Sequence, residues 1–241
     1  MVTTGFNSDG YQTTSEIVDL TVKGGNKCNN WPDFSIGVVP SVAPTGGLIG
    51  DTVIICEGYE CYSLTSEKAT LVIRMSGVRV GAASIVINDN TLWVTGGWNG
   101  YAGGYLASTE YVTVTGTMIG PVLPMAIQYH AMVAINSTCS MVIGGYSNGY
   151  SFASTFYYDH NEEEWINGPS LMQARNSHAA GIVTDEVTGE DFVAITGGSG
   201  SGYLDSTEIL QDGEWVQGKI IDTICYQYGI CLVSKYNYNL F

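Results

Sequence analysis

Residues 91–97 have the sequence TLWVTGG, an apolar run that ends in two glycines. The pattern returns in residues 140–145 (SMVIGG) and in residues 192–198 (FVAITGG). Counted between the first glycines, the copies are 144 − 96 = 48 and 197 − 144 = 53 residues apart. A pattern that recurs at this spacing predicts a chain built from structural repeats. The glycine pairs are Gly96 and Gly97, Gly144 and Gly145, and Gly197 and Gly198.

Other features keep the same phase. A loop rich in glycine and aromatic residues follows each pair, and then a Ser-Thr step opens residues 108–111 (STEY), 154–157 (STFY) and 206–209 (STEI). Tyr111 and Tyr157 end the first two of these steps, and Trp165 and Trp215 follow in phase. We expect both tryptophans to be mostly buried and to pack between neighbouring repeats. Stretches of small and apolar residues precede each copy, at 81–87, 130–135 and 178–183. Short apolar runs separated by glycine-rich turns predict β-strands and an all-β fold.

In this order of features the sequence resembles the Kelch family. A Kelch repeat has a first strand, an apolar strand that ends in Gly-Gly, a strand with a Tyr, and a Trp near the fourth strand. Residues 171–178 (LMQARNSH) are similar to the Met and Arg that precede the next repeat in that family. The resemblance implies a β-propeller of four-stranded antiparallel blades, in which neighbouring blades cover each other's faces.

We expect one propeller domain over residues 1–241. Its blade-equivalents are about 1–40, 41–77, 78–125, 126–172 and 173–219, with a partial unit at 220–241. Two arrangements stay open. In the favoured one the chain is a fragment of a six- or seven-bladed ring. In the other, a strand at 231–235 pairs into the first blade and closes a ring of five.

Composition excludes several classes of partner. Hydrophobic residues make up 45% of the chain and charged residues 13%, which excludes a disordered protein. The net charge is −15, with 8 Lys and Arg against 23 Asp and Glu. Such a charge disfavours binding to nucleic acid and to anionic membrane surfaces. No apolar run reaches eighteen residues, so we expect no membrane insertion.

The sequence leaves extracellular and cytoplasmic locations equally open. Residues 1–5 (MVTTG) lack the basic segment and apolar core of a signal peptide. Asn136 opens the sequon Asn-Ser-Thr and is a candidate glycosylation site. In a secreted protein, a disulfide among Cys28, Cys225 and Cys231 would help to hold the chain ends together. Without a disulfide, Cys56 is expected to be a core residue.

No constellation for catalysis or metal binding stands out. His130 and His178 occupy the same place in successive repeats, which favours a structural role, and His160 lies in a polar turn. The acidic run 185–191 is expected to be a solvated hairpin rather than a cation site. No Gly-x-Ser-x-Gly elbow or phosphate loop occurs. We therefore expect no enzyme activity, no cofactor and no metal. A galactose-oxidase-like or glycosidase-like propeller enzyme is the least favoured alternative.

The expected function is a non-catalytic module that binds a protein partner. Loops 98–105, 146–152 and 199–205 join the second and third strands and are rich in Tyr, Ser, Gly and Asn, as antibody paratopes are. The alternative is a secreted or surface domain that recognises a glycan or an extracellular protein. We expect Tyr105, Phe152 and Leu204 to turn inward. The candidate contact residues are Trp98, Tyr101, Tyr146, Tyr150 and Tyr203.

Overall fold

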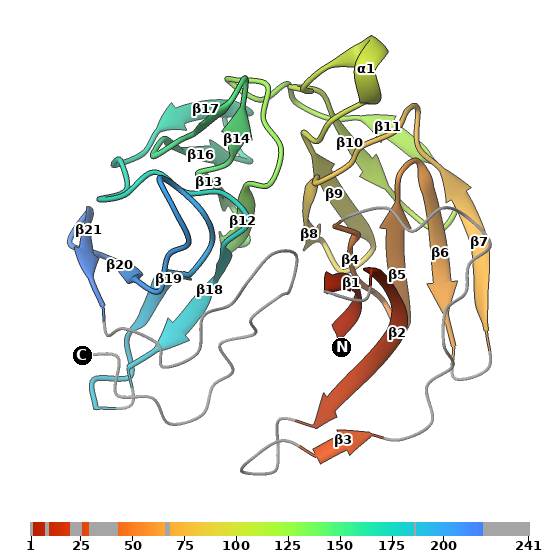
Figure 1. The fold of residues 1–241 in the computed structure, drawn as a ribbon, viewed down its shortest axis with the longest axis horizontal. Helices are drawn as coiled ribbons and strands as arrows, with labels where there is room; N and C mark the ends of the chain where they lie inside the picture. Colours follow the sequence, from red (N-terminus) through yellow and green to blue (C-terminus); the bar gives the residue numbers. More distant parts are fainter. Residues whose placement is uncertain are drawn as a thin grey trace. The chain divides into compact units, whose positions relative to one another are not determined.

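The protein is all-β. The computed structural model describes residues 43–65, 68–185 and 187–218, except for the side chains of residues 101 and 102. It also describes the backbone of three strands between residues 2 and 28 (Figure 1). The chain divides into two compact units, Met1–Val122 and Leu123–Phe241. In the described part of the chain, no helix is long and apolar enough to cross a membrane.

The described part of the first unit forms three antiparallel sheets. The three-stranded sheet consists of β1 (Val2–Asn7), β2 (Gly10–Asp19) and β3 (Asn26–Cys28). Sheet I consists of β4 (Thr45–Ile49), β5 (Thr52–Glu57), β6 (Glu60–Leu64) and β7 (Ala69–Arg74). Sheet II consists of β8 (Ala83–Ile87), β9 (Thr91–Thr95), β10 (Thr109–Val112) and β11 (Thr117–Ile119), with the one-turn helix α1 (Gly100–Gly103) in its loop.

Among its described residues, the second unit has two four-stranded sheets and a short hairpin. Sheet III consists of β12 (Ala131–Asn136), β13 (Cys139–Ile143), β16 (Thr155–Asp159) and β17 (Glu164–Asn167). The hairpin β14 (Tyr146–Ser147) and β15 (Tyr150–Ser151) lies in the loop between β13 and β16. Sheet IV consists of β18 (Ala179–Thr184), β19 (Asp191–Thr196), β20 (Thr207–Gln211) and β21 (Glu214–Gln217).

All four sheets share one register. Each is a meander in which a residue of the first strand faces one of the second strand, which in turn faces one of the third. The three residues paired in this way occupy equivalent positions in the four sheets. The triplets are Thr45, Cys56 and Cys61 in sheet I; Ala83, Thr95 and Thr109 in sheet II; Ala131, Ile143 and Thr155 in sheet III; and Ala179, Thr196 and Thr207 in sheet IV.

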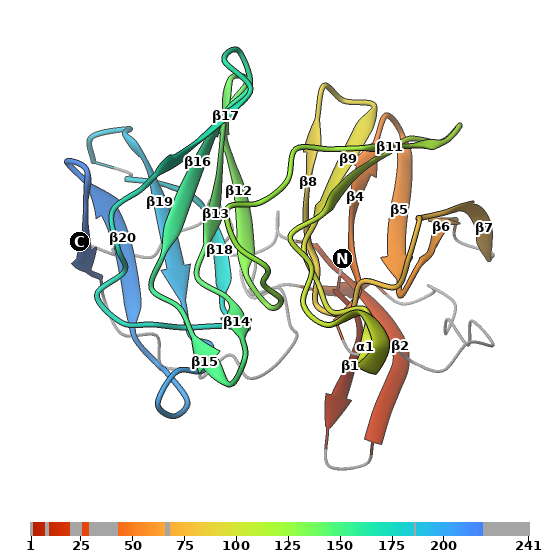
Figure 2. The same cartoon turned by 90° about the horizontal axis from the view of Figure 1, so that it is seen from above.

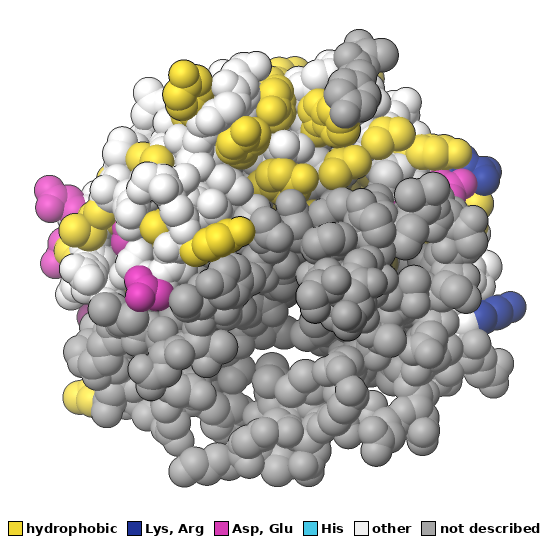
Figure 3. All heavy atoms as spheres, in the orientation of Figure 1, with side chains coloured by type: hydrophobic (Ala, Val, Ile, Leu, Met, Phe, Trp, Pro, Cys, Tyr) yellow, Lys and Arg dark blue, Asp and Glu magenta, His cyan; other side chains and the backbone are white. Residues whose placement is uncertain are grey.

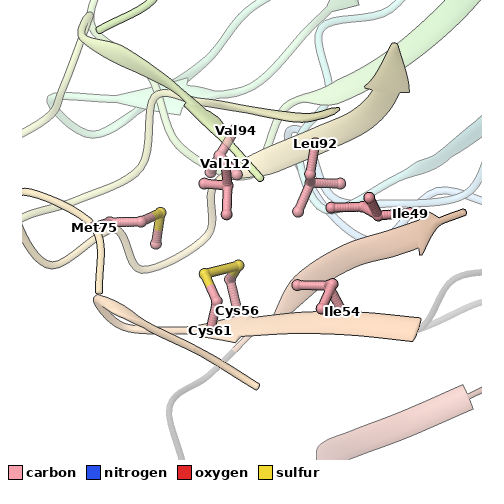
Figure 4. Packing of buried hydrophobic residues seen from close by; sticks show 8 residues of the cluster. All are labelled: Ile49, Ile54, Cys56, Cys61, Met75, Leu92, Val94 and Val112. Atoms are coloured by element: carbon pink, nitrogen blue, oxygen red, sulfur yellow. A yellow bond between two sulfur atoms is a disulfide. The ribbon is translucent and has the colours of Figure 1, made fainter. Parts of the chain in front are cut away.

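In the first unit, sheets I and II pack face to face through their first strands. β4 lies against β8 and β9 (Figure 2). A Cβ at Gly47 would lie 2.5 Å from a methyl of Val86, so a larger residue there would have to displace that side chain. Burial of apolar side chains from both sheets stabilises this contact. The cluster between them, shown in Figure 4, contains Ile49, Ile54, Cys56, Cys61, Met75, Leu92, Val94 and Val112.

In the second unit, β12 of sheet III packs against β18 of sheet IV. Their shared core contains Val133, Met141, Ile143, Leu171, Val193, Ile195 and Trp215. Trp215 is 5% exposed, and its indole N–H donates to the carbonyl of Pro169, so the prediction that it packs between sheets is confirmed. Trp165 is only partly buried, and its ring centroid lies 4.9 Å from that of Tyr158 in the same sheet.

The structure contains a disulfide that the sequence analysis did not predict. Cys56 and Cys61 face each other on β5 and β6 and are bonded. Both are fully buried, so Cys56 is a core residue as well. In sheet IV the equivalent pair is Thr196 and Thr207, whose hydroxyls are hydrogen bonded at 3.0 Å. The predicted disulfide among Cys28, Cys225 and Cys231 lies outside the described side chains.

Candidate interaction surface

The first residue after each Gly-Gly forms a β-bridge with the linker that precedes the first strand: Trp98 with Val80, Tyr146 with Gln128, and Ser199 with Asn176. In sheet IV, Gly198 has φ +89°, a conformation that L side chains rarely adopt. A Cβ there would lie 2.8 Å from the Cβ of His178 and 2.5 Å from the carbonyl oxygen of Asn176. Position 198 therefore requires glycine for two reasons: its backbone is left-handed, and it approaches the preceding linker closely.

A buried arginine holds both ends of loop 199–205. The Arg175 guanidinium donates to the carbonyls of Gly197 and Ser206, which flank the loop, at 2.9 and 3.1 Å. It also donates to the Ser206 hydroxyl and forms an ion pair with Glu208 at 2.6 Å. The Glu208 carboxylate accepts the backbone N–H groups of Met172 and Gln173 in the preceding linker. The carboxylate and the guanidinium thus fix the loop ends to the linker.

The same clamp recurs in sheet II around loop 98–105. Arg79 donates to the carbonyls of Gly96 and Ser108 and pairs with Glu110 at 3.0 Å. Glu110 also accepts the backbone N–H and the hydroxyl of Ser76. Both side chains of the pair are 3% exposed, so the charges are shielded from water and depend on each other.

Sheet III replaces the clamp with apolar residues. Ile127 takes the place of Arg175, since each lies at the same distance before the paired alanine that opens its first strand. Phe156 takes the place of Glu208, since each follows the paired threonine of its third strand. Ile127 is 1% exposed. Pro124, which has no backbone N–H to satisfy, takes the place of Met172. Sheet III therefore lacks the arginine, the glutamate and the backbone N–H donor of the clamp at all three equivalent positions. The sequence carried this signal in Glu110 and Glu208 of the Ser-Thr-Glu steps, and the sequence analysis missed it.

In the second unit the two predicted loops are joined. Asn176 pairs through its backbone with Ser199, and its side-chain amide donates to the Ser199 carbonyl and to the Ser151 hydroxyl, at 3.0 and 2.8 Å. The Ser151 hydroxyl in turn donates to the Ser199 carbonyl. Loops 146–152 and 199–205 therefore form one continuous surface, which we call the paired-loop surface.

Two of the five candidate contact residues project from the paired-loop surface. Tyr150 is 72% exposed and Tyr203 is 60% exposed. Tyr146 is partly buried. The loops also expose Asn148, Gly149, Ser201, Gly202 and Asp205. Exposed tyrosines on hydrogen-bonded loops can bind a protein with little loss of conformational entropy.

The remaining candidates are placed differently. Trp98, in the first unit, is partly buried and forms β-bridges with Val80 and Tyr105. The side chain of Tyr101 lies outside the described residues. Leu204 is 6% exposed, so it turns inward as expected, whereas Phe152 is partly buried.

The two histidines near these loops, His130 and His178, are buried. Burial lowers the pKa of both His130 and His178 to about 3, so both rings are neutral at pH 7. For His178, the nearby charge of Arg175 acts in the same direction. Among the described residues, no cluster of three or more His, Cys, Asp or Glu is placed to hold a metal ion.

In Figure 3, the described surface of the second unit is mostly uncharged on the face shown, with some hydrophobic side chains, and its Asp and Glu side chains lie toward the edge of that described surface. Such a surface suits binding through aromatic and polar contacts rather than through ion pairs. Searches against models of known protein families and against curated proteins find no match.

Proposed function

We propose that this protein is a non-catalytic interaction module that binds a protein partner through the paired-loop surface. The observation that carries the proposal is the exposure of Tyr150 and Tyr203 on loops that are hydrogen bonded to each other through Asn176. Tyrosine is enriched at the centres of protein interfaces because it combines a large apolar area with a polar tip. The Arg175 clamp favours binding further, because a loop fixed in advance loses less entropy on binding.

The proposal rests on a Kelch-type propeller architecture. Four-stranded antiparallel sheets with a common register, packed through their first strands within each unit, support it. In such a propeller the loops between second and third strands share one face with the linkers between blades. The structure has the matching local feature in Asn176, a linker residue that joins two such loops.

A photo-crosslinking experiment tests the proposal. A photoreactive phenylalanine analogue placed at position 150 or 203 should crosslink to the partner, which mass spectrometry then identifies. Affinity for the purified partner is then measured for the double variant Tyr150→Ala/Tyr203→Ala. Interface anchors contribute about 2 kcal/mol or more each, so we expect at least a tenfold loss of affinity.

Val187 offers a matched control. It is 88% exposed and lies in the hairpin between β18 and β19, at the opposite end of sheet IV from loop 199–205. A crosslinker at position 187 should capture no partner, and Val187→Ser should bind as the wild type does. If the double tyrosine variant binds with unchanged affinity and intact circular dichroism, the site lies elsewhere.

A second candidate is a secreted or surface recognition domain. The buried Cys56–Cys61 disulfide favours it, because structural disulfides form and persist in oxidising compartments. The two candidates differ in compartment and ligand. Screening the purified protein on a glycan array tests the glycan form of the second candidate, and specific glycan binding would favour it over the first.

A further inference from the structure

The sequon at Asn136 occupies the tip of a β-hairpin. Asn136 pairs with Cys139 at the ends of β12 and β13, so Ser137 and Thr138 form the two-residue turn. All three sequon residues are exposed. Asn-x-Ser/Thr with x other than Pro occurs once in the 241 residues, at this turn.

The local hydrogen bonds arrange the two side chains that an oligosaccharyltransferase needs. The Asn136 carbonyl oxygen Oδ1 accepts the backbone N–H of Thr138 at 2.8 Å and the Thr138 hydroxyl at 3.0 Å. The amide nitrogen Nδ2 forms no hydrogen bond with the described residues. Asparagine and threonine therefore lie together at the surface, with the reactive nitrogen unused by the fold.

A second, independent observation concerns the cellular compartment in which the protein folds. The Cys56–Cys61 disulfide is in the other unit, yet it also needs an oxidising environment to persist. N-glycosylation takes place in the lumen of the secretory pathway, where such disulfides form. One location thus explains both features.

We propose that Asn136 is an N-glycosylation site and that the protein matures in the secretory pathway. Nδ2 attacks C1 of an oligosaccharide carried on a polyprenyl diphosphate. The new N–C1 bond replaces the C1–O bond, the polyprenyl diphosphate leaves with the bonding electrons, and Nδ2 releases one proton. No oxidant or reductant is needed.

The glycan leaves the paired-loop surface open. β13 runs from the sequon hairpin at Cys139 to Ile143, and loop 146–152 follows at the far end of the strand (Figure 2). The other hairpin of sheet III is at the sequon end, where the His160 N–H donates to the Thr138 carbonyl. A glycan at Asn136 therefore shields the opposite end of sheet III. The inference stands whether or not the paired-loop surface binds a protein.

Mass spectrometry on protein from its native source tests the proposal directly. Peptide-N-glycosidase in heavy-oxygen water converts a glycosylated Asn136 to labelled Asp, and a non-reducing digest shows the Cys56–Cys61 bridge. We expect both signals. An unmodified Asn136 together with free thiols at Cys56 and Cys61 would overturn the proposal.

Translation of the full chain, fused to a signal peptide, with microsomes tests the acceptor site by itself. Protease-protected wild-type chain should show a glycosidase-sensitive gel shift. Asn136→Gln and Thr138→Ala should lose the shift. Thr138→Ser and the matched control Ser137→Ala should keep it, since both retain a sequon. A protected wild-type chain without the shift, or a shift that persists in Thr138→Ala, refutes the assignment.

Discussion

The ion pair of Arg175 and Glu208 allows a quantitative test of how loop 199–205 is held. Arg175→Met leaves the Glu208 carboxylate, which is 3% exposed, without the guanidinium that faces it at 2.6 Å. The substitution also removes the donors to the carbonyls of Gly197 and Ser206. Leaving a buried charge unpaired costs about 3–5 kcal/mol, so we expect the free energy of unfolding to fall by that amount. Glu208→Gln should cost a similar amount, since it strands the guanidinium.

Sheet III indicates how the loss can be reduced. The double variant Arg175→Ile/Glu208→Phe copies Ile127 and Phe156 and leaves no buried charge. Its loss should be smaller than the sum of the losses of Arg175→Ile and Glu208→Phe, each measured as a single variant, by about 2 kcal/mol or more. Adding Met172→Pro, which copies Pro124, removes a backbone N–H that would otherwise lose its acceptor. This third change should regain about 1 kcal/mol.

Urea unfolding at pH 7, followed by tryptophan fluorescence, measures these losses. The control is Arg74→Met, because Arg74 pairs with Glu60 at 2.9 Å but its side chain is 59% exposed. Solvent screens that pair, so we expect its loss to be far smaller than that of Arg175→Met. Strictly additive losses in the double variant, or equal losses for Arg74→Met and Arg175→Met, would refute the reasoning.

Three further predictions concern the core. Trp215→Ala should cost about 3–5 kcal/mol in denaturant melts, and a loss under about 1 kcal/mol would contradict its burial between sheets III and IV. Burial lowers the pKa of His130 and His178 to about 3, below the value of about 6.5 in the unfolded chain. The unfolded state therefore binds more protons between these two pH values. The free energy of unfolding should fall by about 1.4 kcal/mol per pH unit for each histidine as the pH drops from about 6.5 toward 3. Urea melts from pH 7 to pH 4 measure the slope, which His178→Gln should flatten. Cys56→Thr/Cys61→Thr should cost about 2 kcal/mol and abolish any effect of reductant on the melt; an unchanged reductant effect would mean that another disulfide causes it.

The sequence by itself determined the strand pattern. Apolar runs that end in Gly-Gly, Ser-Thr steps and phased tryptophans are local signals, and they predicted a repeated pattern of β-strands without tertiary information. The grouping of four strands into each sheet was implied by the resemblance to the Kelch family. The burial of Trp215 was expected from the same phase, whereas Trp165, at the equivalent place in the preceding repeat, is only partly buried. The positions of the loops followed as well, since a loop lies wherever two predicted strands end.

Only the tertiary structure decided which residues meet. Cys56 and Cys61 are five residues apart, yet their bridge depends on the register of β5 and β6, which composition does not specify. Arg175 and Glu208 are 33 residues apart and meet because a linker crosses the end of the sheet. The exposure of Tyr150 beside the inward turn of Leu204 depends likewise on packing. Local patterns fix the elements, but contacts between distant residues require the folded register, because they arise only when whole strands have paired.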